Sequence, residues 1–337
     1  MNSKNNLILL LIFILFSTCF INSQINYSYP ARKSQKVFVF QNELFLVGGI
    51  KNEKASGTIY SNDIWISSFG DMWVNIAKNP LKPRRNKFGC TVFHNKIFIA
   101  GGYDEQSVRY LNDVWFSEDG IKWTNSVPNA AFQGRVNPTL LEYKGKLYLI
   151  GGNIEADNGD IECLTDIWES KEGSTWTKIS DKLPYKSLNE VQFVVFKDKV
   201  LAFSGGNGVF STTDFVNWTL LEKGGPVFEK NFFSVVVFHD SLYLIGGQNL
   251  NQTLYYTEFL NEVWKSDDGV SWTQICPYPP DDPNVYNKFS IYPARREHAS
   301  VVFKDRILVT GGVTNNFVDY LDDLWCSADG YKWIRMK

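Results

Sequence analysis

A twelve-residue pattern with two tryptophans eight positions apart occurs five times in this 337-residue chain. The clearest copy is Asn112–Trp123 (NDVWFSEDGIKW), and the others end at Trp73, Trp176, Trp272 and Trp333. A sixth, degenerate copy runs from Phe210 to Trp218, so the pattern accounts for all 11 tryptophans. Each copy predicts a hairpin of two aromatic strands, with a glycine such as Gly120 supplying the positive φ that the turn requires.

Two registers are consistent with such a hairpin. A three-residue loop with glycine in the left-handed region sets Trp115 opposite Trp123, whereas a two-residue turn sets Trp123 opposite Phe116. We favour the three-residue loop.

A second pattern precedes each tryptophan hairpin. A short apolar run ends in a pair of glycines, at 48–49, 101–102, 151–152, 205–206, 246–247 and 311–312, and these pairs are 41 to 65 residues apart. Another apolar run stands ahead of each pair, joined to it by a tight polar turn such as 94–96. Each unit therefore predicts four strands, called a to d in chain order. Because their runs are apolar on both faces, we expect the sheets to pack radially against one another.

These features resemble kelch repeats, from Ala31 to the C-terminus. The doubled glycine closing strand b, the tryptophan closing strand d and the period of ~50 residues are typical of that family, whereas the tryptophan on strand c departs from its commonest pattern. The resemblance implies an all-β fold, a six-bladed β-propeller of kelch repeats with four antiparallel strands per blade. The expected blades are residues 31–78, 84–128, 134–180, 187–222, 229–275 and 294–337.

The N-terminus is expected to be a signal peptide, residues 1–23. Lys4 precedes an unbroken apolar run, Leu7–Phe16, which is too short to span a bilayer of roughly 30 Å. Cleavage before Gln24 leaves a single propeller, 24–337, which is secreted or extracytoplasmic; an uncleaved anchor and lipid attachment at Cys19 are the alternatives. The net charge of −2 offers no argument for nucleic acid. We expect a monomer with no membrane span.

Four cysteines remain after cleavage, one in each of four different repeats: Cys90, Cys163, Cys276 and Cys326. A disulfide needs Cα atoms within about 7 Å, and nothing in the sequence brings these positions together. We interpret them as small buried hydrophobic residues.

Metal and cofactor chemistry finds little support in the sequence. A copper enzyme like galactose oxidase, which is a kelch-type protein, needs His and Tyr ligands, but His94 and His239 fall in a–b turns and His298 is expected to be a packed side chain. No nucleophile elbow, glycine-rich phosphate loop or HExxH motif occurs. An acidic b–c loop is interpreted as solvated, with Ca²⁺ binding as the alternative; it contains Glu155, Asp157, Asp160 and Glu162. We expect no cofactor and no metal.

The long b–c and d–a loops fall on one end of the propeller, called the loop face, where function is expected. Eight positions before the aromatic residue that closes strand a, five of the six units carry a cation: Arg32, Arg85, Arg135, Lys230 and Arg295. We expect them to line the mouth of the central channel and bind anionic groups, with Glu190 and Glu297 as counter-charges or a general acid/base. The alternative is that they pair with recurring acids such as Asp113, Asp166 and Asp323.

Unit four breaks the repeat. It takes four residues from Gly206 to Phe210, where the other units take 13 to 17 over the corresponding stretch, and it has Leu188 in place of the cation and Phe215 in place of the turn glycine. It is interpreted either as an eroded repeat or as a notch that admits a chain-like anionic ligand. Three side chains would line that approach: Asn153, Asn207 and Gln248.

Together these features favour a secreted kelch-repeat binding module that engages a protein or glycan ligand, expected to be anionic, on the loop face. The alternative is a carbohydrate mutarotase or epimerase of the sialic acid mutarotase type, a class of similar architecture that would need such Arg and Glu groups.

Overall fold

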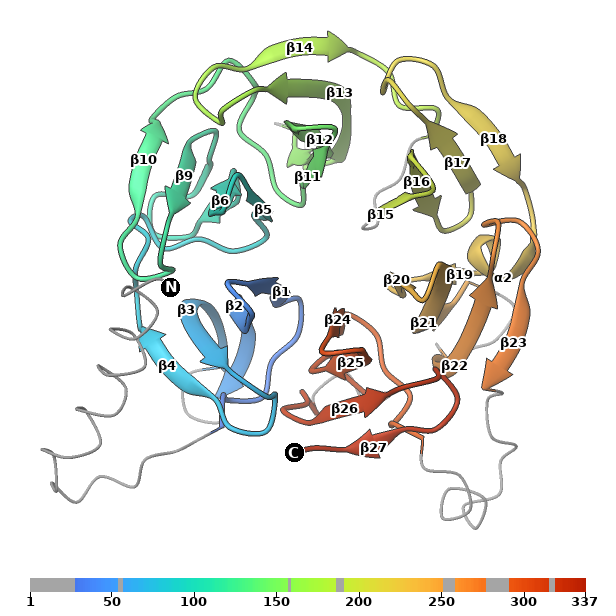
Figure 1. Cartoon of the computed structure of the whole chain (residues 1–337). Coiled ribbons are helices and arrows are strands. Elements are labelled where there is room, and N and C mark those ends of the chain that lie inside the picture. The colour runs from blue at the N-terminus through green and yellow to red at the C-terminus, as the bar shows by residue number, and fades with distance from the viewer. Residues whose placement is uncertain are drawn as a thin grey trace, which may run out of the picture.

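The computed structural model describes residues 28–53, 57–156, 159–185, 191–250, 258–276, 291–314 and 319–337. Over these ranges the chain forms six antiparallel sheets arranged in a ring, with strand a of each sheet nearest the centre (Figure 1). The expected six-bladed β-propeller is confirmed. The expected signal peptide, 1–23, lies outside these ranges, and within them no helix is long and apolar enough to cross a membrane.

Each blade takes its four main strands from one stretch of chain. Blades one to three consist of β1 (Lys36–Phe40), β2 (Glu43–Glu53), β3 (Gly57–Ser67) and β4 (Val74–Ala77); β5 (Gly89–Phe93), β6 (Lys96–Ala100), β9 (Val114–Ser117) and β10 (Thr124–Val127); and β11 (Thr139–Tyr143), β12 (Lys146–Glu155), β13 (Ile161–Ser170) and β14 (Thr177–Ser180).

Blades four to six consist of β15 (Gln192–Phe196), β16 (Lys199–Ser204), β17 (Gly208–Thr212) and β18 (Thr219–Glu222); β20 (Ser234–Phe238), β21 (Ser241–Asn249), β22 (Phe259–Ser266) and β23 (Thr273–Cys276); and β24 (Ala299–Phe303), β25 (Arg306–Thr310), β26 (Leu324–Ser327) and β27 (Ile334–Arg335). The loops add a hairpin of β7 (Tyr103–Asp104) and β8 (Arg109–Tyr110), the strand β19 (Lys230–Asn231) and the helix α2 (Gly225–Phe228).

The a–b connections are two-residue turns. In blade two, Phe93 pairs with Lys96 across the turn, and both central residues, His94 and Asn95, have positive φ, 46° and 55°. Such a turn matches the right-handed twist of the strands that it joins. Since strand a runs away from the loop face, His94 lies on the opposite face, as expected.

The tryptophan hairpin has neither of the two expected registers. Trp115 lies opposite Asn125, and Phe116 lies opposite Thr124. Trp123 is therefore outside the ladder, in the loop that connects β9 to β10. The expected three-residue loop is wrong.

Side-chain hydrogen bonds hold this longer loop in shape. Ser117 Oγ accepts from the amide of Gly120 at 2.8 Å, and Asp119 Oδ1 accepts from two amides, including that of Lys122 at 2.8 Å. The indole of Trp123 donates to the carbonyl of Gly120 at 3.1 Å. The loop thus needs a hydroxyl, a carboxylate and a glycine at fixed spacing, and not only the glycine.

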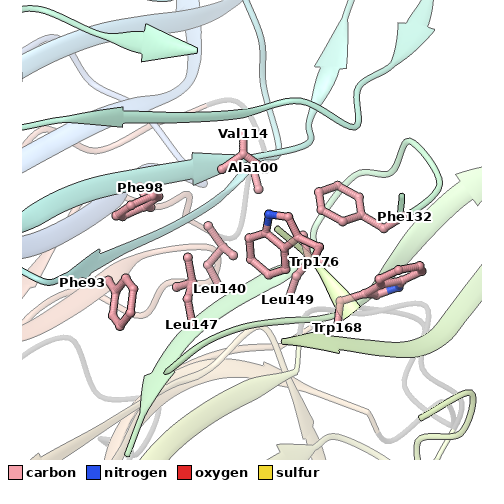
Figure 2. Packing of buried hydrophobic residues seen from close by; sticks show 10 residues of the cluster. All are labelled: Phe93, Phe98, Ala100, Val114, Phe132, Leu140, Leu147, Leu149, Trp168 and Trp176. Carbon is pink, nitrogen blue, oxygen red and sulfur yellow. The ribbon is translucent and has the colours of Figure 1, made fainter. Parts of the chain in front are cut away.

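Apolar side chains of adjacent blades interlock between the sheets. Between blades two and three, Phe98 belongs to a buried cluster with Leu149, Trp168 and Trp176 (Figure 2). Gly173, in the turn of blade three, has φ +79°, and a Cβ there would lie 2.2 Å from a ring carbon of Phe98. The turn glycine therefore permits both the backbone conformation and the close approach of the neighbouring blade.

The ring closes by packing between blades six and one. Tyr29, just ahead of blade one, is buried in one cluster with Trp73 of blade one and Leu308 of blade six. Its hydroxyl donates to the carbonyl of Asp323 at 3.2 Å. No strand is exchanged between these two blades over the described part of the chain.

Blade four replaces the turn glycine by Phe215. This residue keeps the left-handed conformation, with φ +61°, and its amide donates to Thr212 Oγ1 at 2.9 Å, so the capped loop is retained. The phenyl ring is fully buried and stacks on Tyr148 of blade three with ring centroids 4.0 Å apart. The substitution fills the space between blades three and four.

We predict that Phe215→Gly destabilises the protein. It relieves about 1 kcal/mol of left-handed strain but removes a buried ring, at a cost of about 3–5 kcal/mol. Equilibrium urea unfolding should show a net loss of about 2–4 kcal/mol, and the exposed neighbour Val216→Ala should change stability by less than about 0.5 kcal/mol. A Phe215→Gly variant as stable as wild type would mean that strain cancels the packing.

Candidate functional site

The four arginines of the expected ring are enclosed by protein. Arg32, Arg135 and Arg295 have 0% of their surface exposed and Arg85 has 1%. Each forms a two-pronged ion pair with an aspartate on strand c of its own blade or just before it, and the shortest distances are 2.7 Å to Asp63, 2.5 Å to Asp113, 2.5 Å to Asp166 and 2.6 Å to Asp323. The expected placement at the channel mouth is therefore wrong, and the pairing alternative holds.

The same aspartates bind the first tryptophan of each hairpin. In blade two, the indole of Trp115 donates to Asp113 Oδ2 at 2.7 Å, and equivalent bonds of 2.7 to 2.9 Å occur in blades one, three and six. Burial by itself would raise the pKa of Asp63, but hydrogen bonds and charge from Arg32, with hydrogen bonds from Lys51 and Trp65, outweigh it and hold the pKa below its usual range.

The contacts of these buried arginines also explain why the glycines are paired. Arg85 donates to the carbonyl of Gly101 at 3.1 Å. A Cβ on Gly101 would lie 2.9 Å from the carbonyl oxygen of Arg135 in the next blade, and a Cβ on Gly102 would lie 2.7 Å from that of Asn86. Both glycines, at φ +67° and +104°, are thus required by the backbone segments that carry the arginines.

Blade five uses a different pair at the same place. Lys230 Nζ lies 2.7 Å from Glu262 Oε1, and both groups are nearly enclosed. The shorter cation is matched by a longer carboxylate, but the indole nitrogen of Trp264 then has no hydrogen-bond partner. In blade four the corresponding sequence positions hold no charge at all, because they are Leu188, Gly208 and Phe210.

Residues two positions after these cations form a ring around the channel on the loop face, here called the mouth ring. Its described members are Ser34, Lys87, Asn137, Phe232 and Glu297, each with a positive φ of 52° to 56°. Backbone hydrogen bonds run between them from blade to blade, from Ser34 to Glu297 at 2.9 Å and from Asn137 to Lys87 at 2.7 Å. Glu190 holds the sixth position in sequence and lies outside the described ranges.

Glu297 is the centre of a polar cluster in this ring. Lys33 Nζ lies 3.0 Å from its carboxylate, the hydroxyl of Ser34 donates to it at 2.8 Å, and Arg296 Nε lies 3.4 Å away. Arg296 also donates to Gln248 Oε1. Of the expected site residues, the structure thus brings Glu297 and Gln248 together, through an arginine that the sequence argument did not select.

The remaining expected site residues lie apart from this cluster. Asn153 is buried and pairs through its backbone with Val136. Asn207 lies in the tight turn between β16 and β17, and its amide donates to Ser204 Oγ at 3.0 Å. At this turn α2 packs against the blade, and the carbonyl of Phe228 accepts from the amide of Gly206 at 3.0 Å. The missing loop of unit four is confirmed, whereas α2 beside it was not foreseen. Ligand binding by these residues stays a prediction.

The third histidine is packed, as expected. The imidazole of His298 is 3.0 Å from the hydroxyl of Ser234, and desolvation, aided by the charge of Arg295, lowers the pKa of His298 to about 3. The described residues contain no group of three His, Cys, Asp or Glu side chains that could hold a metal; Asp157 of the acidic loop lies outside them. Of the four cysteines, Cys276 and Cys326 are buried, and Cys90 and Cys163 are partly buried.

Comparisons with known proteins agree with this architecture. The family model "Kelch motif" matches residues 84–115, which run from the lead-in of blade two to the first tryptophan of its hairpin. A solved structure titled "Structure of YjhT" superposes with a TM-score of 0.69 at 12% sequence identity, over 94% of this chain and 100% of that one. At this identity the likeness is one of fold. No match was found among curated protein sequences.

We predict strong coupling within the buried ion pairs. Arg85→Leu should cost about 3–5 kcal/mol because it leaves Asp113 buried and unpaired. In a double-mutant cycle, Arg85→Leu with Asp113→Leu should lose about 1–3 kcal/mol less than the sum of the two single losses. The exposed pair Lys96–Glu118, 2.9 Å apart in the same blade, serves as the control and should couple by less than about 1 kcal/mol. Equal coupling in both pairs would contradict a structural role for the arginine.

We also predict a loss of stability in acid. The pKa values of Asp63, Asp166 and Asp323 are lowered in the folded state because the arginines outweigh burial. Since an unfolded aspartate has a pKa of about 3.9, the unfolded chain binds more protons below that pH, and stability falls as the pH drops through the folded values. Each such carboxyl contributes up to about 1.4 kcal/mol per pH unit.

Urea unfolding between about pH 4 and pH 2 tests this slope. The variant Arg32→Leu/Asp63→Leu should lose stability less steeply than wild type over that interval. An unchanged slope would show that Asp63 does not contribute.

Proposed function

Because the chain is a six-bladed kelch-repeat β-propeller, we propose that it is a secreted binding module that engages an anionic protein or glycan ligand at its mouth ring. The leading support is Lys87, whose side chain is exposed in the ring and has no ion pair among the described residues. A rigid propeller with a variable ring at one end is a common arrangement for recognition.

The charges around the ring favour an anion. Its described members and the residues just before them include three cations, Lys33, Lys87 and Arg296, but a single carboxylate, Glu297. Like charges in a concave site focus the field and raise the local concentration of an oppositely charged ligand. Glu297 already has three donors around it, and it is available as an internal counter-ion that a ligand carboxylate or sulfate would displace.

Binding to an array of sulfated, carboxylated and neutral glycans and of acidic peptides tests the proposal. We expect the full chain to prefer acidic ligands and to bind them less tightly as salt increases. Lys87→Ala should weaken binding at least ~5-fold, or about 1 kcal/mol, whereas Glu297→Gln should strengthen it because it leaves the cations without their internal partner. Lys122→Ala, in an exposed turn on the opposite face, should have no effect.

Equal binding of acidic and neutral ligands, or full affinity in Lys87→Ala, would contradict the proposal. A parallel measurement of sugar anomer exchange by NMR tests the mutarotase alternative. Exchange that is accelerated by wild type and abolished by Glu297→Gln would replace binding by catalysis.

A further inference from the structure

A hollow of about 450 Å³ lies on the loop face between the b–c hairpins of blades one and two. One wall is Tyr60 on β3, the other is β7 with the turn that joins it to β8, and the segment leading into β5 supplies the remaining lining residues. The lining residues are Tyr60, Arg84, Arg85, Asn86, Tyr103, Asp104, Glu105 and Gln106. Its volume is within the range of small-molecule sites, roughly 300–1,000 Å³.

The composition of the lining is unusual for a pocket of this size. Every lining residue carries an aromatic ring or a planar polar group, and none is aliphatic. Pockets for apolar ligands are lined mainly by hydrophobic side chains. A pyranose fits the present lining because its C–H face packs on a tyrosine ring, while its adjacent hydroxyls exchange paired hydrogen bonds with amide, guanidinium and carboxylate groups.

The charge of the hollow differs from that of the mouth ring. Arg85 is paired with Asp113, so the charges left among the lining residues are those of Arg84, Asp104 and Glu105. Lys87 and Arg109, which do not line the hollow, act on the two carboxylates from outside it. Because its carboxylates and guanidinium are balanced in this way, the hollow offers hydrogen-bonding groups to a neutral ligand.

The walls of the hollow are held in place before any ligand arrives. Asn86 and Tyr103 exchange both backbone hydrogen bonds, at 3.1 and 3.0 Å. The carboxylate of Asp104 accepts from the amide of Gln106 at 3.0 Å, and the Tyr103 ring packs against Tyr110 with centroids 5.2 Å apart. A site on paired strands loses little conformational entropy when a ligand binds.

Tyr60 completes the opposite wall. It is paired with Ile50 in the extended hairpin of β2 and β3, and its ring is half-buried. Partial burial, and then the charge of Glu105, raises the pKa of Tyr60, and both residues line the hollow.

We propose that this hollow binds a neutral saccharide. Tyr60 and Tyr103 supply the aromatic surfaces, and Arg84, Asn86, Glu105 and Gln106 supply the hydroxyl contacts. None of the described mouth-ring residues lines the hollow, so the proposal goes beyond the anion-binding function and does not depend on it.

Titration of the full chain with single sugars, followed by saturation-transfer NMR and calorimetry, tests the proposal. The probes are glucose, galactose, mannose, xylose, fucose and N-acetylglucosamine, with glucuronic acid as the charged counterpart of glucose. At least one neutral sugar should bind. Tyr60→Ala should weaken that binding at least ~10-fold, or about 1.4 kcal/mol, while Tyr60→Phe, which keeps the ring, should stay within ~3-fold of wild type. Tyr331→Ala, an exposed tyrosine in a c–d turn on the opposite face, should bind as wild type does.

Three results would overturn the proposal: no saturation transfer to any neutral sugar at about 20 mM, full affinity in Tyr60→Ala, or a preference for glucuronic acid over glucose. Lys87→Ala separates the two sites. Loss of acidic-ligand binding in Lys87→Ala with neutral-sugar binding retained supports both sites, and loss of neutral-sugar binding in that variant would assign the sugar to the mouth ring instead.

Discussion

The buried arginine–aspartate pair is the interaction on which this propeller depends. In blade two, Arg85 lies in the segment that leads into strand a, its guanidinium reaches Asp113 just before strand c, and one of its nitrogens donates to the carbonyl of Gly101 just after strand b. One side chain thus fixes three strands of a blade relative to one another. The two carbonyls that approach the glycine pair come from the lead-in segments that carry the arginines, which explains why the blade needs both glycines.

Such a pair can be exchanged or lost only as a unit. Removing one charge leaves the other buried without compensation, at about 3–5 kcal/mol, whereas replacing both by apolar groups is often tolerated. Blade five exchanges both members, with Lys230 and Glu262. Blade four has lost both, along with the tryptophan that binds the carboxylate, and the positions hold Leu188, Gly208 and Phe210. The loss of the cation, the carboxylate and the tryptophan in blade four is therefore one coupled change. Phe215 fills the space at the boundary with blade three.

The fold was predictable because its determinants are local and repeated: the glycine pairs, the apolar runs and the tryptophan spacing. The hairpin register was not, because it depends on hydrogen bonds that backbone amides of the loop donate to the side chains of Ser117 and Asp119. The expected placement of the arginines at the channel mouth was wrong for a different reason. Arg85 and its equivalents recur in nearly every unit, and recurrence indicates architecture. The signal for the ring lay two residues further on, where the spacing is constant but the residue type changes from unit to unit.

The mouth ring separates the requirements of the fold from those of recognition. Its described members adopt left-handed backbone without being glycine, a conformation that costs each roughly 1–2 kcal/mol. Backbone hydrogen bonds between neighbouring blades, such as the one between Ser34 and Glu297, hold these residues in the strained conformation. Because these backbone hydrogen bonds do not depend on the side chains, equivalent positions hold serine, lysine, asparagine, phenylalanine and glutamate. A symmetric scaffold thereby presents an asymmetric ring, and an asymmetric ring is what recognition of a specific ligand requires.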